Sequence, residues 1–148
     1  MKLKSVIYEL FEIDFGSLKG QTDSESHEID REIYLEFETG EIFYFSWCNE
    51  PVQYCIGFKP ERFNENEPDH VIDATNWKVW CELVGQDISF VFADESHQIL
   101  ELKGLSSSVY LSSQERGSWG ADVLHISKSL PIVSNYKANQ QDFDLPPL

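Results

Sequence analysis

The chain has 148 residues, with 26 acidic against 11 basic side chains and a formal net charge of −15. This length suits one domain with a sizeable core, and an aromatic content of 14% is too high for a disordered chain. The acidic balance argues against nucleic acids and anionic membrane surfaces as main partners, because both attract clustered lysine and arginine.

Residues 1–15 carry apolar side chains at both helical and alternating spacing. The density of β-branched and aromatic residues favours a strand, with a helix as the alternative. Acids interrupt this apolar run, so it does not have the pattern of a signal peptide. Residues 16–30 are polar and acidic and are predicted to form a long loop.

The negative charge concentrates in residues 23–41 and 61–73, and each segment holds a single cation, Arg31 or Arg62. Such segments are either solvated loops or a docking surface for a cation-rich macromolecule. We assign four side chains of the second segment to a partner surface: Glu61, Glu65, Glu67 and Asp69.

The stretch EIYLEFETGEIFYFSW, residues 32–47, contains two alternating runs around Thr39-Gly40. This pattern predicts a β-hairpin, with Ile33, Leu35 and Phe37 on one face. Residues 52–58 are predicted to form the next strand. The prolines, asparagines and charges that follow it are typical of a loop.

Residues 73–85 have the strongest helical pattern in the chain, and Gly85 provides a stop signal. Four residues recur at i, i+3, i+4 and i+7, namely Trp77, Trp80, Cys81 and Val84. This spacing predicts a helix over about residues 76–84 that lies across a sheet.

Short strands are predicted at 87–94, 97–103, 108–113 and 122–127, and their short links favour an antiparallel meander. The fold class is therefore mainly β: an antiparallel sandwich or partly open barrel of about seven or eight strands with one short helix. Residues 1–135 form the predicted domain and residues 136–148 a polar C-terminal tail.

The stretch SSQERGSWGADV, residues 112–123, places Trp119 between two glycines that permit a bend. Trp119 either covers one end of the core or forms an interface lip with Arg116. The second interpretation rests on the enrichment of both residue types at binding hot spots. We include Arg116 and Trp119 among the partner-binding candidates. A catalytic loop is the least favoured interpretation, because no base or nucleophile is evident beside it.

No phosphate-binding loop, dinucleotide fingerprint or nucleophile elbow occurs in the sequence. The four histidines and three cysteines lack metal-ligand spacing, so we expect no metal, no cofactor and no enzyme activity. Cys48, Cys55 and Cys81 have no disulfide pattern, and we expect reduced, buried and inert thiols and a cytoplasmic protein.

The stretches EIYLEFETGEIFYFSW and YLSSQERGSWGADVLHIS resemble small bacterial β-rich immunity proteins of polymorphic toxin systems. The resemblance covers about a quarter of the chain and transfers no site residues. It implies a cytoplasmic, acidic, single-domain protein that binds and blocks a cognate toxin domain, often a basic nuclease.

We therefore expect a non-catalytic acidic protein that neutralises a basic toxin domain. The alternative is a β-barrel-like module that binds a small molecule or sugar through an aromatic-lined pocket, with weak hydrolytic activity. Its candidate pocket residues are Trp77, Trp80 and Trp119. A pocket in which tryptophans and carboxylates converge would favour the alternative. A filled interior with an acidic convex patch would favour the binding protein.

Overall fold

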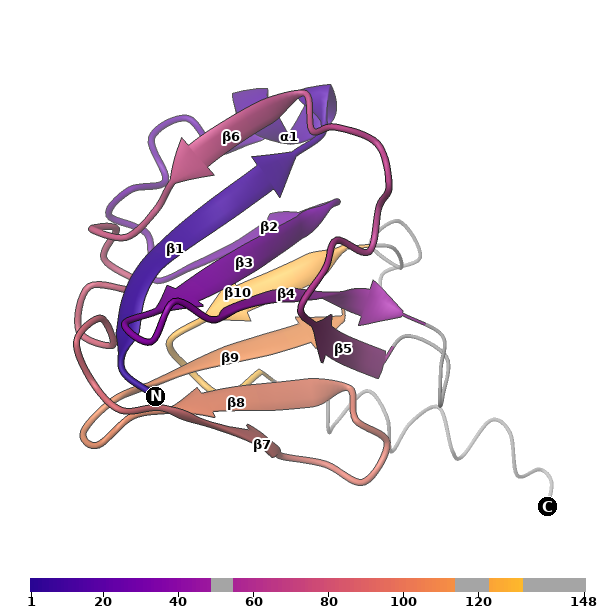
Figure 1. Ribbon diagram of the computed structural model, residues 1–148. Coiled ribbons are helices and arrows are strands. Elements are labelled where there is room, and N and C mark those ends of the chain that lie inside the picture. Colours follow the sequence, from indigo (N-terminus) through magenta and orange to yellow (C-terminus); the bar gives the residue numbers. More distant parts are fainter. Residues whose placement is uncertain (49–54, 114–122, 132–148) are drawn as a thin grey trace, which may run out of the picture.

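The computed structural model describes residues 1–48, 55–113 and 123–131, which form a sandwich of two five-stranded antiparallel sheets (Figure 1). The first sheet has the order β5-β4-β3-β1-β6, and the second has the order β2-β10-β9-β8-β7. The strands are β1 Leu3–Leu10, β2 Ser26–Ile29, β3 Glu32–Phe37, β4 Ile42–Cys48, β5 Cys55–Lys59, β6 His70–Asp73, β7 Ser89–Phe92, β8 Ile99–Lys103, β9 Ser108–Ser113 and β10 Leu124–Ser127.

The hydrophobic core lies between the sheets, as the alternation of the strands requires. The first sheet contributes alternate residues of its central strands, among them Tyr8, Leu35 and Phe37, which are fully buried. The facing positions of the second sheet include Leu111 and Ile126. A mainly β sandwich is therefore the architecture, as the sequence predicts.

The predicted hairpin is confirmed, with Ile33 paired to Phe45 across β3 and β4. The N-terminal segment is a strand over Leu3–Leu10 and pairs with β3 and β6. The predicted meander is also present, because β7, β8, β9 and β10 are consecutive neighbours in the second sheet.

The predicted helix over 76–84 is wrong. Residues 75–86 form successive turns, in which hydrogen bonds to the residue three positions back alternate with bonds to the residue four positions back. Tertiary contacts explain the outcome, since the Lys78 amide donates to the Thr22 carbonyl and the Gly85 amide to the Leu3 carbonyl. These turns bury Trp80 and Leu83, but Cys81, a member of the predicted apolar face, is exposed, so that face is not buried as a unit.

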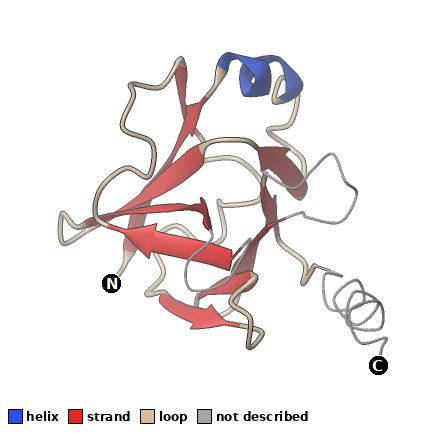
Figure 2. Ribbon diagram, turned by 90° about the vertical axis from the view of Figure 1, so that its right-hand side faces the viewer, coloured by secondary structure: helices blue, strands red, loops and turns tan. Residues whose placement is uncertain are grey.

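The predicted loop over 16–30 is wrong in part. A short helix, α1 (Glu12–Ser17), precedes it and reaches its first residues, and β2 occupies Ser26–Ile29 (Figure 2). Asp14 supports both the helix and the chain after β2. Its carboxylate accepts the Phe11 amide at 3.3 Å and the Asp30 amide at 2.8 Å. The four-residue strands β2 and β6 were not predicted, and they account for the larger number of strands in the described residues.

Within the described ranges, the model contains no helix of the length and apolarity needed to cross a membrane. The predicted C-terminal tail, 136–148, lies outside the described residues, as do positions 52–54 of the predicted strand 52–58.

Candidate functional site

Residues 60–69 form a strap across the outer face of the first sheet. The strap connects β5 to β6, which lie at opposite edges of that sheet (Figure 1). Four strand spacings separate these edges, or about 19 Å at 4.8 Å each. The connection must therefore cross β4, β3 and β1, and it covers side chains that would otherwise face water.

Two like charges lie under the strap. Glu9 on β1 and Glu32 on β3 are direct cross-strand partners, and both are buried, with exposed fractions of 3% and 1%. Like charges at such positions repel each other and are costly to bury. The arrangement therefore requires compensating cations and hydrogen-bond donors from the surrounding chain.

Arg62 of the strap compensates Glu9 with two parallel contacts. Its Nε donates to Glu9 Oε1 at 2.8 Å and its Nη2 to Glu9 Oε2 at 3.0 Å. This bidentate geometry is the strongest form of a side-chain ion pair. It fixes the beginning of the strap to the end of β1.

Glu32 holds the middle of the strap by accepting hydrogen bonds from backbone amides of the strap. Its carboxylate accepts the Phe63 amide at 2.8 Å and the Asn64 amide at 3.1 Å. Burial raises the pKa of Glu32, while these two donors and the neighbouring Arg31 guanidinium act in the opposite direction. Two backbone donors and one cation therefore replace the water that the carboxylate loses.

Arg31 completes the network from the sheet side. Its guanidinium donates to the carbonyl oxygens of Asn64, Asn66 and Glu67, and its Nε lies 3.5 Å from Glu32 Oε2. The Phe11 ring lies 5.5 Å from the guanidinium carbon, within cation–π range. The strap is therefore tied to the sheet by one buried arginine, one half-buried arginine and two buried carboxylates.

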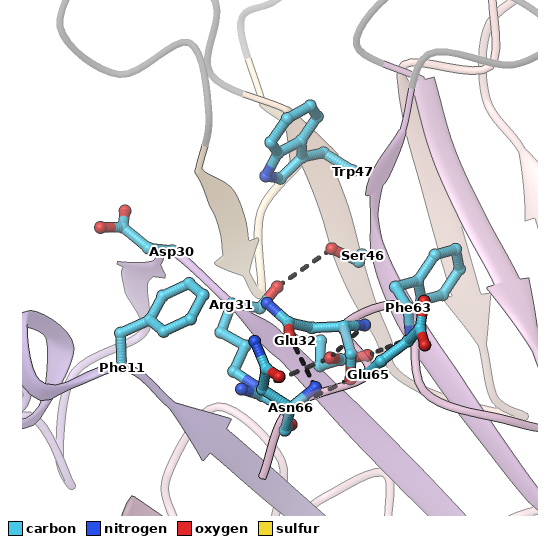
Figure 3. Close-up of a pocket in the computed structure, with 10 residues that line it drawn as sticks. Phe11, Asp30, Arg31, Glu32, Ser46, Trp47, Phe63, Glu65 and Asn66 are labelled. Carbon is cyan, nitrogen blue, oxygen red and sulfur yellow. Dashed lines mark hydrogen bonds and ion pairs between the residues drawn. The ribbon is translucent and has the colours of Figure 1, made fainter. Parts of the chain in front are cut away.

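A pocket of about 590 Å³ opens beside this network (Figure 3). Its lining includes three carboxylates against one guanidinium, together with three aromatic rings, so it favours a cationic or polar guest with an apolar part. The lining residues are Phe11, Asp30, Arg31, Glu32, Ser46, Trp47, Phe63, Asn64, Glu65 and Asn66.

The four predicted strap carboxylates are all exposed. Glu67 pairs with Arg62 at 3.1 Å, and Asp69 accepts the Glu12 amide at 3.0 Å. Glu65 also lines the pocket. Within the described residues, Glu61 and Glu65 make no hydrogen bond or ion pair, so their charge faces solvent. Arg116 and Trp119 lie outside the described residues.

Trp77 and Trp80, the two described tryptophans of the alternative hypothesis, do not line this pocket. Trp80 is fully buried, and its Nε1 donates to the Tyr8 hydroxyl at 2.7 Å. The hydroxyl lies 2.6 Å from His27 Nε2, and Trp77 packs edge-on against both Tyr8 and His27. These two tryptophans belong to the core, and the pocket tryptophan is Trp47.

The Tyr8–His27–Trp80 cluster is electrically neutral. Because Trp80 donates to the Tyr8 oxygen, the tyrosine proton is directed to His27 Nε2, which acts as the acceptor. Burial lowers the pKa of His27 to about 4, and the nearby His125 adds to the effect. Burial also raises the pKa of Tyr8. The cluster is a structural link between the sheets and has no access to a substrate.

Most of the pocket residues were not among the site residues predicted from the sequence. Glu32 and Trp47 looked like ordinary members of a hairpin, and Arg31 like a minor interruption of an acidic run. The available signal was the single arginine in each acidic segment, since an isolated cation among many acids often marks a specific ion pair.

Among residues 1–48, 55–113 and 123–131, no group of three or more histidine, cysteine or acidic side chains is arranged to hold a metal ion. No protein family model, curated protein or solved structure matches the chain. Arguments about function therefore rest on the geometry of the strap and the pocket.

Proposed function

We propose that the protein is a non-catalytic acidic binding protein that neutralises a basic partner, in the manner of an immunity protein that blocks a cognate toxin domain such as a nuclease. The observation that carries the proposal is the strap. Its four carboxylates are exposed, while its backbone and Arg62 are fixed to the sheet by buried groups. The acidic surface is thus held in place before a partner arrives.

The preorganisation of the strap and its negative charge affect different rate constants of binding. A fixed strap avoids the entropic cost of ordering a loop on binding, which slows dissociation. Its exposed carboxylates attract a basic partner at long range, which speeds association and makes the rate depend on salt. Both properties suit an inhibitor that must capture its target quickly and hold it.

The pocket beside the strap gives the proposed interface an anchor point. A lysine or arginine side chain can lay its apolar stem against Phe11, Trp47 or Phe63 and direct its charge to Glu65. A binding role also agrees with the use of Glu9 and Glu32, whose oxygens are engaged by Arg62 and by strap amides. The contacts of these buried carboxylates hold the strap on the sheet.

The first test is recovery of the partner. The tagged protein is used to capture chains from the cell that produces it, at low and at high salt, and the bound chains are identified. The proposal expects a basic protein that elutes as the salt concentration rises. Recovery of no basic protein at low salt would remove most of its support.

The second test locates the surface with two variants of equal charge. One neutralises Glu61, Glu65, Glu67 and Asp69 by amide substitution, and the control neutralises Glu38, Glu41, Glu82 and Glu95. We expect the strap variant to lower the association rate by about tenfold or more at low salt and to flatten its salt dependence. Equal effects of both variants would show that only total charge matters.

The pocket brings Trp47 together with the carboxylates of its lining, the combination expected of the alternative, and so favours a second candidate function, the binding of a small polar molecule or sugar. Titration with arginine amide and with simple sugars, followed by NMR, separates the two functions. Saturable sugar binding that is lost in Trp47→Ala supports this candidate. Binding of the cationic probe alone supports the anchor-point interpretation.

A further inference from the structure

Two of the three cysteines are cross-strand neighbours. Cys48 ends β4 and Cys55 begins β5, and the two residues are direct partners in the register of these antiparallel strands. Their sulfur atoms lie 3.2 Å apart, and Cys55 Sγ lies 3.4 Å from the Cys48 carbonyl oxygen as a hydrogen-bond donor. At this separation the two thiols are hydrogen-bonded, and either sulfur can be the donor.

The strand geometry also fits a covalent bond between these sulfurs. Direct partners in antiparallel strands have Cα atoms about 4.5 or 5.5 Å apart, and both values lie within the disulfide range of about 4.4–6.8 Å. An S–S bond is about 2.05 Å long, so the sulfurs need to approach by little more than 1 Å. Rotation of the side chains supplies most of this movement.

A glycine keeps the space around this pair open. A Cβ atom added at Gly57, two residues after Cys55, would lie 2.9 Å from Cys48 Sγ, which is closer than real contacts allow. The Cys48 thiol therefore occupies the space above Gly57.

The two thiols differ in their access to solvent. Cys48 is half-buried, whereas Cys55 is fully buried. A dissolved disulfide can therefore reach Cys48 first, and Cys55 is placed to attack the product. This is the arrangement of an attacking and a resolving cysteine.

We propose that Cys48 and Cys55 form a reversible dithiol–disulfide site that reacts with low-molecular-weight disulfides of the glutathione type. The Cys48 thiolate attacks one sulfur of oxidised glutathione, forms a mixed disulfide and releases one glutathione thiolate. The Cys55 thiolate then attacks the Cys48 sulfur and releases the second glutathione. Two protein thiols are oxidised, one glutathione disulfide is reduced to two thiols, and the two thiol protons go to solvent or to the leaving thiolates.

This inference goes beyond the proposed function and does not rest on it. The crosslink would join the end of β4 to the start of β5, directly after the pocket residue Trp47. Oxidation would therefore fix the β4–β5 pairing at the end of the sheet that carries the pocket.

The third cysteine is an internal control. Cys81 is exposed, so the expected burial of all three thiols is wrong at this position, and its sulfur contacts the Lys78 carbonyl oxygen at 3.6 Å. It has no cysteine beside it within the described residues, so exchange at Cys81 must stop at a mixed disulfide.

The test equilibrates the folded wild-type protein with oxidised and reduced glutathione, blocks the remaining thiols with an alkylating agent and maps the products by mass spectrometry. We expect an intramolecular Cys48–Cys55 link without bound glutathione, and a glutathione adduct at Cys81. Because the wild-type chain is used, the result does not depend on a variant that folds poorly.

Two variants check the order of the steps. Cys48→Ser should leave Cys55 largely unreacted because it is buried, and Cys55→Ser should accumulate one glutathione on Cys48. A stable adduct on Cys48 of the wild-type protein, or two unmodified thiols after equilibration in oxidised glutathione, would overturn the proposal.

Discussion

Tyr8 and Glu9 are adjacent on β1, and they lie in two different kinds of buried network. Tyr8 faces the other sheet and joins a neutral cluster with His27 and Trp80. Glu9 faces outward and joins a charged cluster under the strap. The core between the sheets is linked by neutral hydrogen bonds, because an ion there would lose all its water. The outer face tolerates ions because the strap brings its own donors and a cation.

The largest effect should come from the neutral cluster. Trp80→Ala removes a fully buried indole that donates to Tyr8, which joins the two sheets through His27, and we expect a loss of about 4 kcal/mol in the free energy of unfolding. Denaturant titration measures this loss. Trp80→Phe is the matched control, since it keeps most of the packing and removes only the N–H donor. Equal losses for both variants would show that the hydrogen bond dominates over packing.

The charged cluster should be nearly as sensitive. Glu32→Ala leaves Arg31 without its neighbouring carboxylate and the Phe63 and Asn64 amides without an acceptor, so we expect a loss of about 3 kcal/mol. Hydrogen exchange at these two amides should accelerate more than in the rest of the sheet. Glu36→Ala, a half-buried acid on the same strand, should cost less than about 1 kcal/mol. An equal loss at Glu36 would contradict the special role of the strap contacts.

Acid should weaken the neutral cluster before it protonates most carboxylates. His27 has a pKa of about 4 in the folded protein and about 6.5 when unfolded, so the unfolded chain binds more protons between these values. The contribution of neutral His27 to the free energy of unfolding is fully present above pH 6.5. This contribution, about 3 kcal/mol in all, is lost as the pH falls towards 4.

Unfolding titrations at several pH values test this dependence. His27→Asn should remove most of the slope between pH 4 and 6.5, whereas His125→Gln should retain most of it. A slope that survives His27→Asn would place the acid sensitivity elsewhere.

The smallest effect on stability is expected at the surface of the strap. Neutralising Glu61, Glu65, Glu67 and Asp69 together should change the unfolding free energy by less than about 0.5 kcal/mol per site, because exposed ion pairs contribute little. Thermal melts check this expectation. A cooperative loss comparable to that of Glu32→Ala would mean that the exposed acids, and not the buried ones, hold the strap in place.

Local alternation predicted the hairpin because apolar and polar residues alternate along β3, whose inward residues Ile33, Leu35 and Phe37 are buried, and because a glycine turn joins it to β4. Apolar spacing could not distinguish the turns around Trp80 from a helix, because the backbone bonds that hold them run to Thr22 and Leu3, which lie far away in the sequence. The strap network could not be predicted from the sequence, for a different reason. Glu9 and Glu32 occupy the outward positions of alternating strands, where acids are ordinarily solvated, and only the long β5–β6 connection covers them. Sequence spacing carries no information about such a crossing.

The position of β2 has a consequence for synthesis of the chain. Among the described strands, β2 pairs with β10 alone, and β10 emerges from the ribosome roughly one hundred residues later. At about 5–20 residues per second, the interval lasts on the order of 5–20 seconds. Of the described strands, those of the first sheet are all complete by Asp73, and so is the strap. They can therefore assemble during this interval, in which His27 lacks its neighbouring strand β10. The nascent protein therefore presents its acidic strap before the second sheet has closed over the histidine.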